Sequence, residues 1–126
     1  MKSYIADASA AAFFSEFSKY KIGVALYDKS MNCISWGWNK RKTHPRQKKY
    51  ADKVGQGNRL YLHAEIDALI KVRSVMPYTI VVVRTTSKGL GMARPCPICM
   101  RAIKEAGVRE IYYSDKDGAL IKEYIY

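Results

Sequence analysis

Three stretches of the chain have the apolar spacing or the boundary residues of helices. Apolar side chains cluster on one side of the first two stretches, and Pro77 ends the second. Pro97 lies in the first turn of the third, where its missing N–H costs little, and Gly107 follows where a helix C-cap belongs. We therefore expect helices over Tyr4–Phe17, Tyr61–Ser74 and Pro97–Ala106.

Shorter apolar runs, several of them rich in β-branched residues, predict strands between these helices. The turn Asp28-Lys29-Ser30 joins the first two runs into an antiparallel hairpin, and the third run has the composition of a buried central strand. The order of elements predicts a mixed α/β sheet with helices on its faces, and loops over 39–59 and 87–94. The expected strands are Ile22–Tyr27, Cys33–Trp38, Thr79–Arg84, Val108–Tyr113 and, at an edge, Leu120–Ile125.

Length and composition indicate one globular domain, spanning residues 1–126. A chain of 126 residues with 48% hydrophobic residues can bury a core without disulfides. It has neither an apolar run long enough to cross a membrane nor a leader-like apolar segment, so we expect a cytoplasmic protein without a membrane partner. The three cysteines fit two metal ligands and a solitary Cys33.

Positive charge is the strongest compositional bias. The formal net charge is +11, which favours partners that carry phosphate, whether nucleotides or nucleic acid. Between residues 40 and 59 eight cations face a single acid, Asp52. This segment is interpreted either as a solvated loop or as a phosphate contact, and charge runs are often just solvated. The cations are Lys40, Arg41, Lys42, Arg46, Lys48, Lys49, Lys53 and Arg59.

Two short motifs carry the candidate chemistry: His63-Ala64-Glu65, and Pro95 followed by a Cys-x-x-Cys pair. His63, Cys96 and Cys99 supply three ligands of the kinds that zinc prefers, which leaves a fourth position for water. Glu65 is not needed as a ligand and is free to move protons. Cys-x-x-Cys alone fits a redox pair or half of a structural zinc site, but the combination with His-x-Glu favours a catalytic zinc.

At these motifs the sequence resembles the cytidine/deoxycytidylate deaminase superfamily, and more specifically its deoxycytidylate and tRNA-adenosine branch, which has His as the first ligand. The resemblance extends to Gly23–Leu26, to Gly37-Trp38-Asn39 and to most of the chain. It implies a three-layer α/β/α cytidine-deaminase-like fold with a mixed five-stranded sheet, and a homo-oligomer. It also implies that Zn²⁺ is held by His63, Cys96 and Cys99, with Glu65 as the proton shuttle.

The candidate substrate contacts come from the resemblance and from the charge. The resemblance assigns sugar or base contacts to Asn39 and backbone contacts to Ala64 and to the segment around Pro95. The basic segment adds His44 and Arg46 as phosphate contacts, while Tyr61 and Trp38 are either base-stacking rings or ordinary core.

Three functions remain open at this point. The preferred one is hydrolytic deamination of a cytosine nucleotide or nucleoside, such as dCMP or cytidine. The second is deamination of cytosine or adenine in single-stranded DNA or RNA, in which tyrosines stack on bases. The third is a non-catalytic, zinc-containing nucleic-acid-binding protein, against which the intact Glu65 argues.

Overall fold

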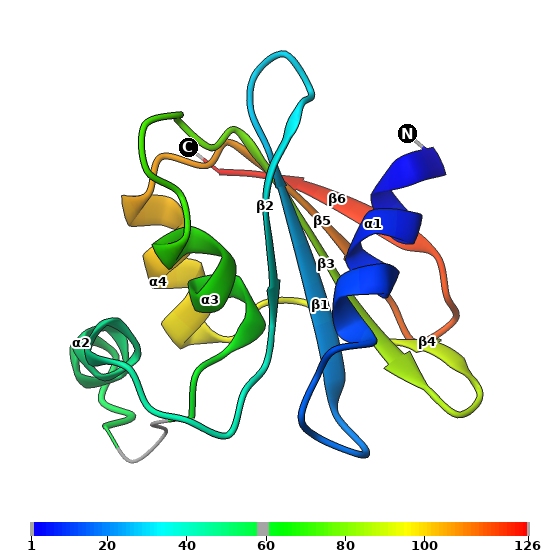
Figure 1. The fold of residues 1–126 in the computed structure, drawn as a ribbon, viewed down its shortest axis with the longest axis horizontal. Coiled ribbons are helices and arrows are strands. Elements are labelled where there is room, and N and C mark those ends of the chain that lie inside the picture. The colour runs from blue at the N-terminus through cyan, green and yellow to red at the C-terminus, as the bar shows by residue number, and fades with distance from the viewer. Residues whose placement is uncertain (1, 58–60, 126) are drawn as a thin grey trace.

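The computed structural model describes residues 2–57 and 61–125, with side chains from Tyr4 onward. Four helices and six strands form three layers, with one sheet between helices (Figure 1). The helices are α1 (Lys2–Ala12), α2 (Pro45–Lys53), α3 (Ala64–Ile70) and α4 (Pro97–Glu105). The strands are β1 (Lys21–Tyr27), β2 (Cys33–Trp38), β3 (Thr79–Thr86), β4 (Gly89–Gly91), β5 (Glu110–Ser114) and β6 (Leu120–Tyr124).

The sheet is mixed, with strand order β2-β1-β3-β5-β6 and the short β4 paired to β3. Only β3 and β5 run parallel, and α4 forms the crossover between them. The predicted hairpin of β1 and β2 is confirmed, with Val24 opposite Gly37. The α/β/α class and the five expected strands therefore agree with the sequence prediction, while their spatial order and β4 are additions to it.

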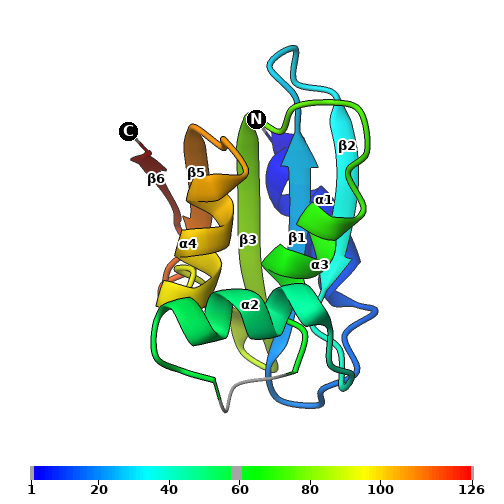
Figure 2. The ribbon, with the colours of Figure 1, turned by 90° about the vertical axis from the view of Figure 1, so that its left-hand side faces the viewer.

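Each face of the sheet has its own core. Alternate residues of β1 and β3, such as Val24 and Val82, point toward α3 and α4. Their neighbours Ala25 and Val83 pack on the other face, under α1. Figure 2 shows α3 and α4 side by side on one face, with α2 lying across them near the ends where they begin.

Two strand glycines allow the helices to approach the sheet closely. A Cβ at Gly23 would overlap the α1 backbone at Ala8 and Ala12. A Cβ at Gly37 would overlap the α3 backbone at Ala64 and Ala68. Both helices therefore pack backbone against backbone on the sheet, which any larger residue would prevent.

The predicted loop over 39–59 was wrong in its centre, because α2 lies there. Pro45 occupies the first turn, and the ring of His44 accepts a hydrogen bond from the backbone N–H of Arg46 as the helix cap. Gln47 and Ala51, four residues apart, are fully buried, while most of the lysines face solvent. Proline at the helix start was the available signal, but the dense positive charge obscured the narrow buried stripe.

Two predicted helices are shorter than expected. The first ends at Ala12 rather than Phe17, since the side chain of Ser15 turns to donate a hydrogen bond to Asn39 near the start of β1. The second begins at Ala64 rather than Tyr61, since Leu62 pairs with the backbone of Lys42 and Lys40 in an extended conformation. The predicted loop over 87–94 likewise contains β4. Within the described ranges, no helix is both long and apolar enough to cross a membrane.

Candidate metal and catalytic site

Three potential metal ligands meet where α3 and α4 begin. The ligand atoms of His63, Cys96 and Cys99 all lie within 4.8 Å of one another. His63 Nδ1 is 3.3 Å from the Sγ of Cys99 and 3.5 Å from that of Cys96. In the part of the chain that the structure describes, this is the one group of three or more His, Cys, Asp or Glu residues close enough to hold an ion.

The donor set and its spacing fit zinc. Tetrahedral zinc with Zn–N and Zn–S bonds of about 2.1 and 2.3 Å holds nitrogen and sulfur ligands about 3.6 Å apart. The two N···S separations are close to this value. One imidazole and two thiols are ligands that zinc prefers, and three protein ligands leave a coordination position for a reactant.

The ends of two helices set the ligand positions. His63 is the residue before α3 and Cys96 the residue before α4, and both have extended backbones. Cys99 lies three residues later on α4, so its side chain lies on the same side as Cys96. The positive end of each helix dipole favours the thiolate form that a metal requires.

The two thiols differ in their surroundings. The pKa of Cys96 is lowered to about 4, mainly by a hydrogen bond from Cys99 and to a smaller extent by one with His63. Burial raises the pKa of Cys99 above its usual range, and the hydrogen bond that it donates to Cys96 adds to the effect. The protein groups alone thus favour one thiolate and one thiol, and a bound cation would release the second proton.

Gln47 holds the backbone of the histidine ligand. Its side-chain oxygen accepts a hydrogen bond of 3.0 Å from the N–H of His63, and Gln47 is fully buried. This N–H lies at the start of α3, where no helical partner exists for it. The basic segment therefore reaches the metal site through one buried amide of α2, a link that motif spacing does not reveal.

Glu65 lies in the first turn of α3, beside the ligands, and its side chain lines a hollow next to them. It is only 5% exposed, and burial raises the pKa of its carboxyl group. A buried carboxyl group with a raised pKa is suited to accepting and returning protons near neutral pH.

The hollow has a volume of about 410 Å³, which is in the usual range for small-ligand sites. Its walls come from the segment before β1, the end of β2, the start of α3 and the segment before α4. They combine aromatic and aliphatic side chains with a few polar groups. The lining residues are Phe17, Tyr20, Ile22, Asn39, Tyr61, Leu62, His63, Ala64, Glu65, Met92, Ala93, Arg94 and Cys96.

The fold places only some of the candidate substrate-contacting residues at the hollow beside Glu65. Asn39 and Ala64 line this hollow, whereas Pro95 is buried directly before Cys96 without lining it. His44 and Arg46 do not line it: His44 caps α2, and Arg46 borders a different hollow between α2, α3 and α4.

Asn39 is largely occupied within the protein. Its side-chain oxygen accepts hydrogen bonds from the hydroxyl of Ser15 and from the N–H of Ile22, the latter at 3.1 Å. Its amide nitrogen donates to the carbonyl of Tyr20. Asn39 therefore ties three segments of the wall together, and one amide hydrogen remains for another acceptor.

Of the two candidate base-stacking rings, one lies at the hollow and the other does not. Tyr61 lines the hollow and is 54% exposed. Trp38 packs on Phe14 instead, under the ammonium groups of Lys40 and Lys71. Phe17, Tyr20, Met92 and Arg94 were not predicted as lining residues. Tertiary packing brings the first two to the hollow, whereas the other two lie just before Pro95, which was an available signal.

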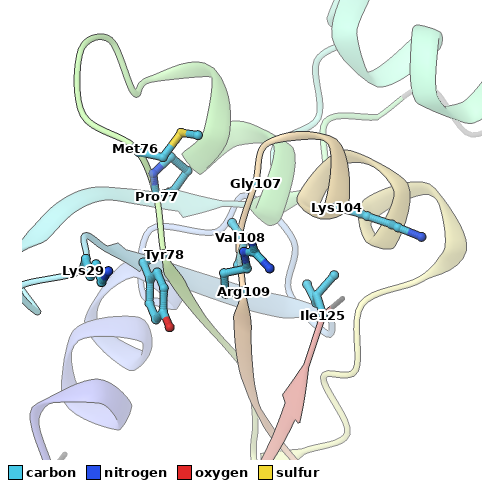
Figure 3. Close-up of a pocket in the computed structure, with 9 residues that line it drawn as sticks. All are labelled: Lys29, Met76, Pro77, Tyr78, Lys104, Gly107, Val108, Arg109 and Ile125. Atoms are coloured by element: carbon cyan, nitrogen blue, oxygen red, sulfur yellow. The ribbon is translucent and has the colours of Figure 1, made fainter.

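Another hollow lies at the opposite end of β3 and β5, near the residues at which these strands begin (Figure 3). It has a volume of about 510 Å³ and three cations: Lys29, Lys104 and Arg109. Its lining includes none of the candidate ligands or proton carriers, so the chemistry belongs to the smaller hollow.

The family model of the cytidine and deoxycytidylate deaminase zinc-binding region matches residues 1–115. No curated protein is a significant match.

Several solved structures share the fold. The cytidine deaminase from Burkholderia pseudomallei is 23% identical, with a TM-score of 0.69 over 98% of this chain and 91% of that chain. The dCMP deaminase from the cyanophage S-TIM5 is 25% identical, with a TM-score of 0.61 over 91% of this chain and 82% of that chain. A second structure of that enzyme, in complex with dCMP and dUMP, is also similar, at 24% identity and a TM-score of 0.61 over 91% of this chain and 80% of that chain. By its match to the family model, which covers both motifs, the chain belongs to the cytidine and deoxycytidylate deaminase family.

Proposed function

We propose that this protein is a zinc-dependent hydrolytic deaminase of a cytosine nucleotide or nucleoside. The observation that carries the proposal is the position of Glu65: a buried carboxyl group beside three zinc-type ligands in a hollow of small-molecule size. A purely structural zinc site needs no such carboxyl group, so the geometry argues against a non-catalytic role.

The reaction adds water to C4 of the base and releases ammonia, which leaves a carbonyl group. Zinc, when bound, would lower the pKa of water near Glu65 toward neutrality. In our proposal Glu65 accepts a proton from the water and passes it to the ring nitrogen. It then takes a second proton from the hydroxyl group formed at C4 and delivers it to the departing amino group. One carboxyl group can serve all four transfers because it is not held as a ligand.

The walls of the hollow suit a flat base. Ile22, Leu62 and Met92 are apolar. Phe17 packs edge-on against Tyr61, with 5.9 Å between the centres of the two rings. Such walls exclude water from the ring and leave the polar groups near Glu65 to orient it. The dCMP deaminase of the cyanophage S-TIM5 supports a cytosine substrate, since its structure holds dCMP and dUMP.

The decisive experiment is product analysis by mass spectrometry over a panel of substrates. The panel holds dCMP, CMP, deoxycytidine, dCTP, adenosine, guanine, a cytosine-containing single-stranded DNA and a tRNA. Wild type is expected to convert a monomeric cytosine compound to its uracil product. Glu65→Gln is expected to lose about 10²- to 10⁴-fold in rate, the usual range for a general acid–base group.

Metal content separates a chemical defect from a folding defect. Glu65→Gln should retain the zinc content of wild type, since the carboxyl group is not a proposed ligand. Conversion of the polymers alone would replace this proposal with deamination of nucleic acid. Full activity of Glu65→Gln would contradict the assigned proton shuttle.

A further inference from the structure

A third hollow, of about 610 Å³, lies where β3 ends and the segment before β1 passes it. Three of its lining residues are cations, Lys19, Lys21 and Arg84, and none is a carboxylate. Within the described residues, none of the three forms an ion pair. Side-chain hydroxyl groups complete the lining, from Ser18, Thr85, Thr86 and Ser87.

Arg84 contains a buried donor that has no partner. Its Nε atom is buried and forms no hydrogen bond within the part of the chain described here. Burying an unpaired donor costs free energy, so such a group calls for a ligand or another explanation. Among the residues described, no other buried side-chain nitrogen or oxygen atom lacks a partner.

One aromatic ring separates this hollow from the candidate active site. The guanidinium carbon of Arg84 lies 4.5 Å from the centre of the Tyr20 ring. Tyr20 also lines the hollow that contains Glu65. In the sequence Lys21 lies between Tyr20 and Ile22, and Ile22 is another lining residue of the Glu65 hollow. The basic hollow therefore lies next to the Glu65 hollow, because Arg84 contacts the Tyr20 ring that lines the latter.

We propose that Arg84, with Lys19 and Lys21, binds the phosphate group of a nucleotide substrate whose base lies beside Glu65. This inference rests on the proposed function and narrows it from nucleosides to nucleotides. Guanidinium, ammonium and hydroxyl groups around a hollow without carboxylates match the charge and the hydrogen-bonding capacity of phosphate.

The other basic regions are less suited to this role. His44 and Arg46 lie outside the Glu65 hollow, on the side of α2. The hollow of Figure 3 has three cations, but Lys104 extends away from Lys29 and Arg109, and no lining residue has an unpartnered buried donor.

The test compares dCMP with deoxycytidine, which differ by the phosphate alone. For Arg84→Gln we expect kcat/KM for dCMP to fall about 10- to 100-fold, the effect of losing a charge-assisted contact to phosphate. For deoxycytidine we expect kcat/KM to change less than about twofold, because this substrate has no phosphate group that Arg84 could contact. Lys21→Gln, a milder surface change, should shift the same ratio in the same direction.

Lys29→Gln is the matched control, because it removes one exposed positive charge at the opposite end of the sheet. It should leave both substrates unaffected. Equal losses for dCMP and deoxycytidine in Arg84→Gln would overturn the phosphate site and assign Arg84 to the packing of Tyr20. An unchanged ratio in both Arg84→Gln and Lys21→Gln would overturn it as well.

A binding measurement separates this inference from the proposed function. Calorimetric titration with dUMP and deoxyuridine needs no turnover. Wild type should bind dUMP more tightly than deoxyuridine, and Arg84→Gln should bind the two compounds with similar affinity. If wild type deaminates both monomers but binds dUMP and deoxyuridine equally, the phosphate site is wrong and the proposed function stands. If wild type converts no cytosine monomer of the panel and binds neither dUMP nor deoxyuridine, both fall.

Discussion

At the scale of single residues, the site combines groups that the motifs reveal with groups that they do not. His63, Cys96 and Cys99 were predicted as ligands from their motifs and from the family resemblance, and the structure brings their ligand atoms together. Gln47 was not identified, although it bonds the backbone of His63. Ligand-supporting residues of this kind orient a metal site, and their loss typically weakens metal binding about 10- to 100-fold.

Gln47→Leu is therefore expected to weaken zinc binding while leaving the three ligands in place. The variant keeps a buried side chain of similar size but removes the acceptor for the N–H of His63, which costs about 1–3 kcal/mol. Zinc affinity, measured by competition with a chelator, should fall about 10- to 100-fold. Lys48→Gln, on the exposed side of α2, is the control and should keep the zinc affinity of wild type. Cys96→Ser shows the zinc affinity expected when a ligand is lost.

An unaltered zinc affinity in Gln47→Leu would show that α2 does not position the ligand. A loss of zinc as complete as in Cys96→Ser would indicate collapse of the site instead. Circular dichroism of each variant distinguishes collapse from a local change.

At the scale of elements, close packing of α3 on the sheet sets the position of the Glu65 carboxyl group, which we propose as the proton carrier. α3 begins directly after His63 and carries Glu65, and its backbone lies against Gly37 of β2. α1 lies against Gly23 in the same way on the other face, but it contributes no side chain to the Glu65 hollow. The two glycines therefore have similar packing roles and different functional consequences.

Gly37→Ala and Gly23→Ala make a matched pair. Each added methyl group should lower the free energy of unfolding by about 1–3 kcal/mol, since backbone must move to admit it. Only Gly37→Ala should also lower kcat of the folded enzyme, because a displacement of about 1 Å at a catalytic group can cost about 10²-fold. Urea unfolding and steady-state kinetics check the two effects.

Two results for Gly37→Ala and Gly23→Ala would contradict this prediction. Equal kcat values in the two variants, at equal stability, would mean that α3 tolerates displacement or that Glu65 does not act from it. A loss of kcat in Gly23→Ala alone would place a functional contact on α1.

At the scale of the whole molecule, the positive charge is distributed over several surfaces rather than concentrated at the site. Part of it is neutralised locally: Lys40 and Lys71 pair with the buried Asp67, and Lys53 links α2 to Glu105 of α4. Other cations surround the hollows beside Tyr20 and in Figure 3. The net charge of +11 thus does not by itself indicate which surface meets phosphate.

Assembly is a separate expectation at this scale. Several large apolar side chains are exposed in the single chain, among them Phe13 at 79% and Met76 at 72%. β2 and β6 end the sheet, each with one neighbouring strand. Together with the homo-oligomer implied by the family resemblance, these features predict that the 14.4 kDa chain sediments as a dimer or larger assembly. A strict monomer at micromolar concentration in analytical ultracentrifugation would contradict the prediction.

The sequence by itself determined the order of the principal elements and the hairpin of β1 and β2, and it predicted the metal ligands and the proton carrier. These features depend on local patterns: strand alternation, helix-boundary residues, and ligands spaced to meet at the start of a helix. The family match over residues 1–115 agrees with this part of the interpretation.

Only the tertiary structure decided which other residues reach the site. Tyr20 and Gln47 approach it from segments outside the motifs, and Arg84 lies next to it through the Tyr20 ring. His44 and Arg46 were expected there from their charge, but α2 directs them elsewhere. The physical reason is that the direction of a side chain depends on how its element packs, and long-range packing leaves no fixed spacing in the sequence.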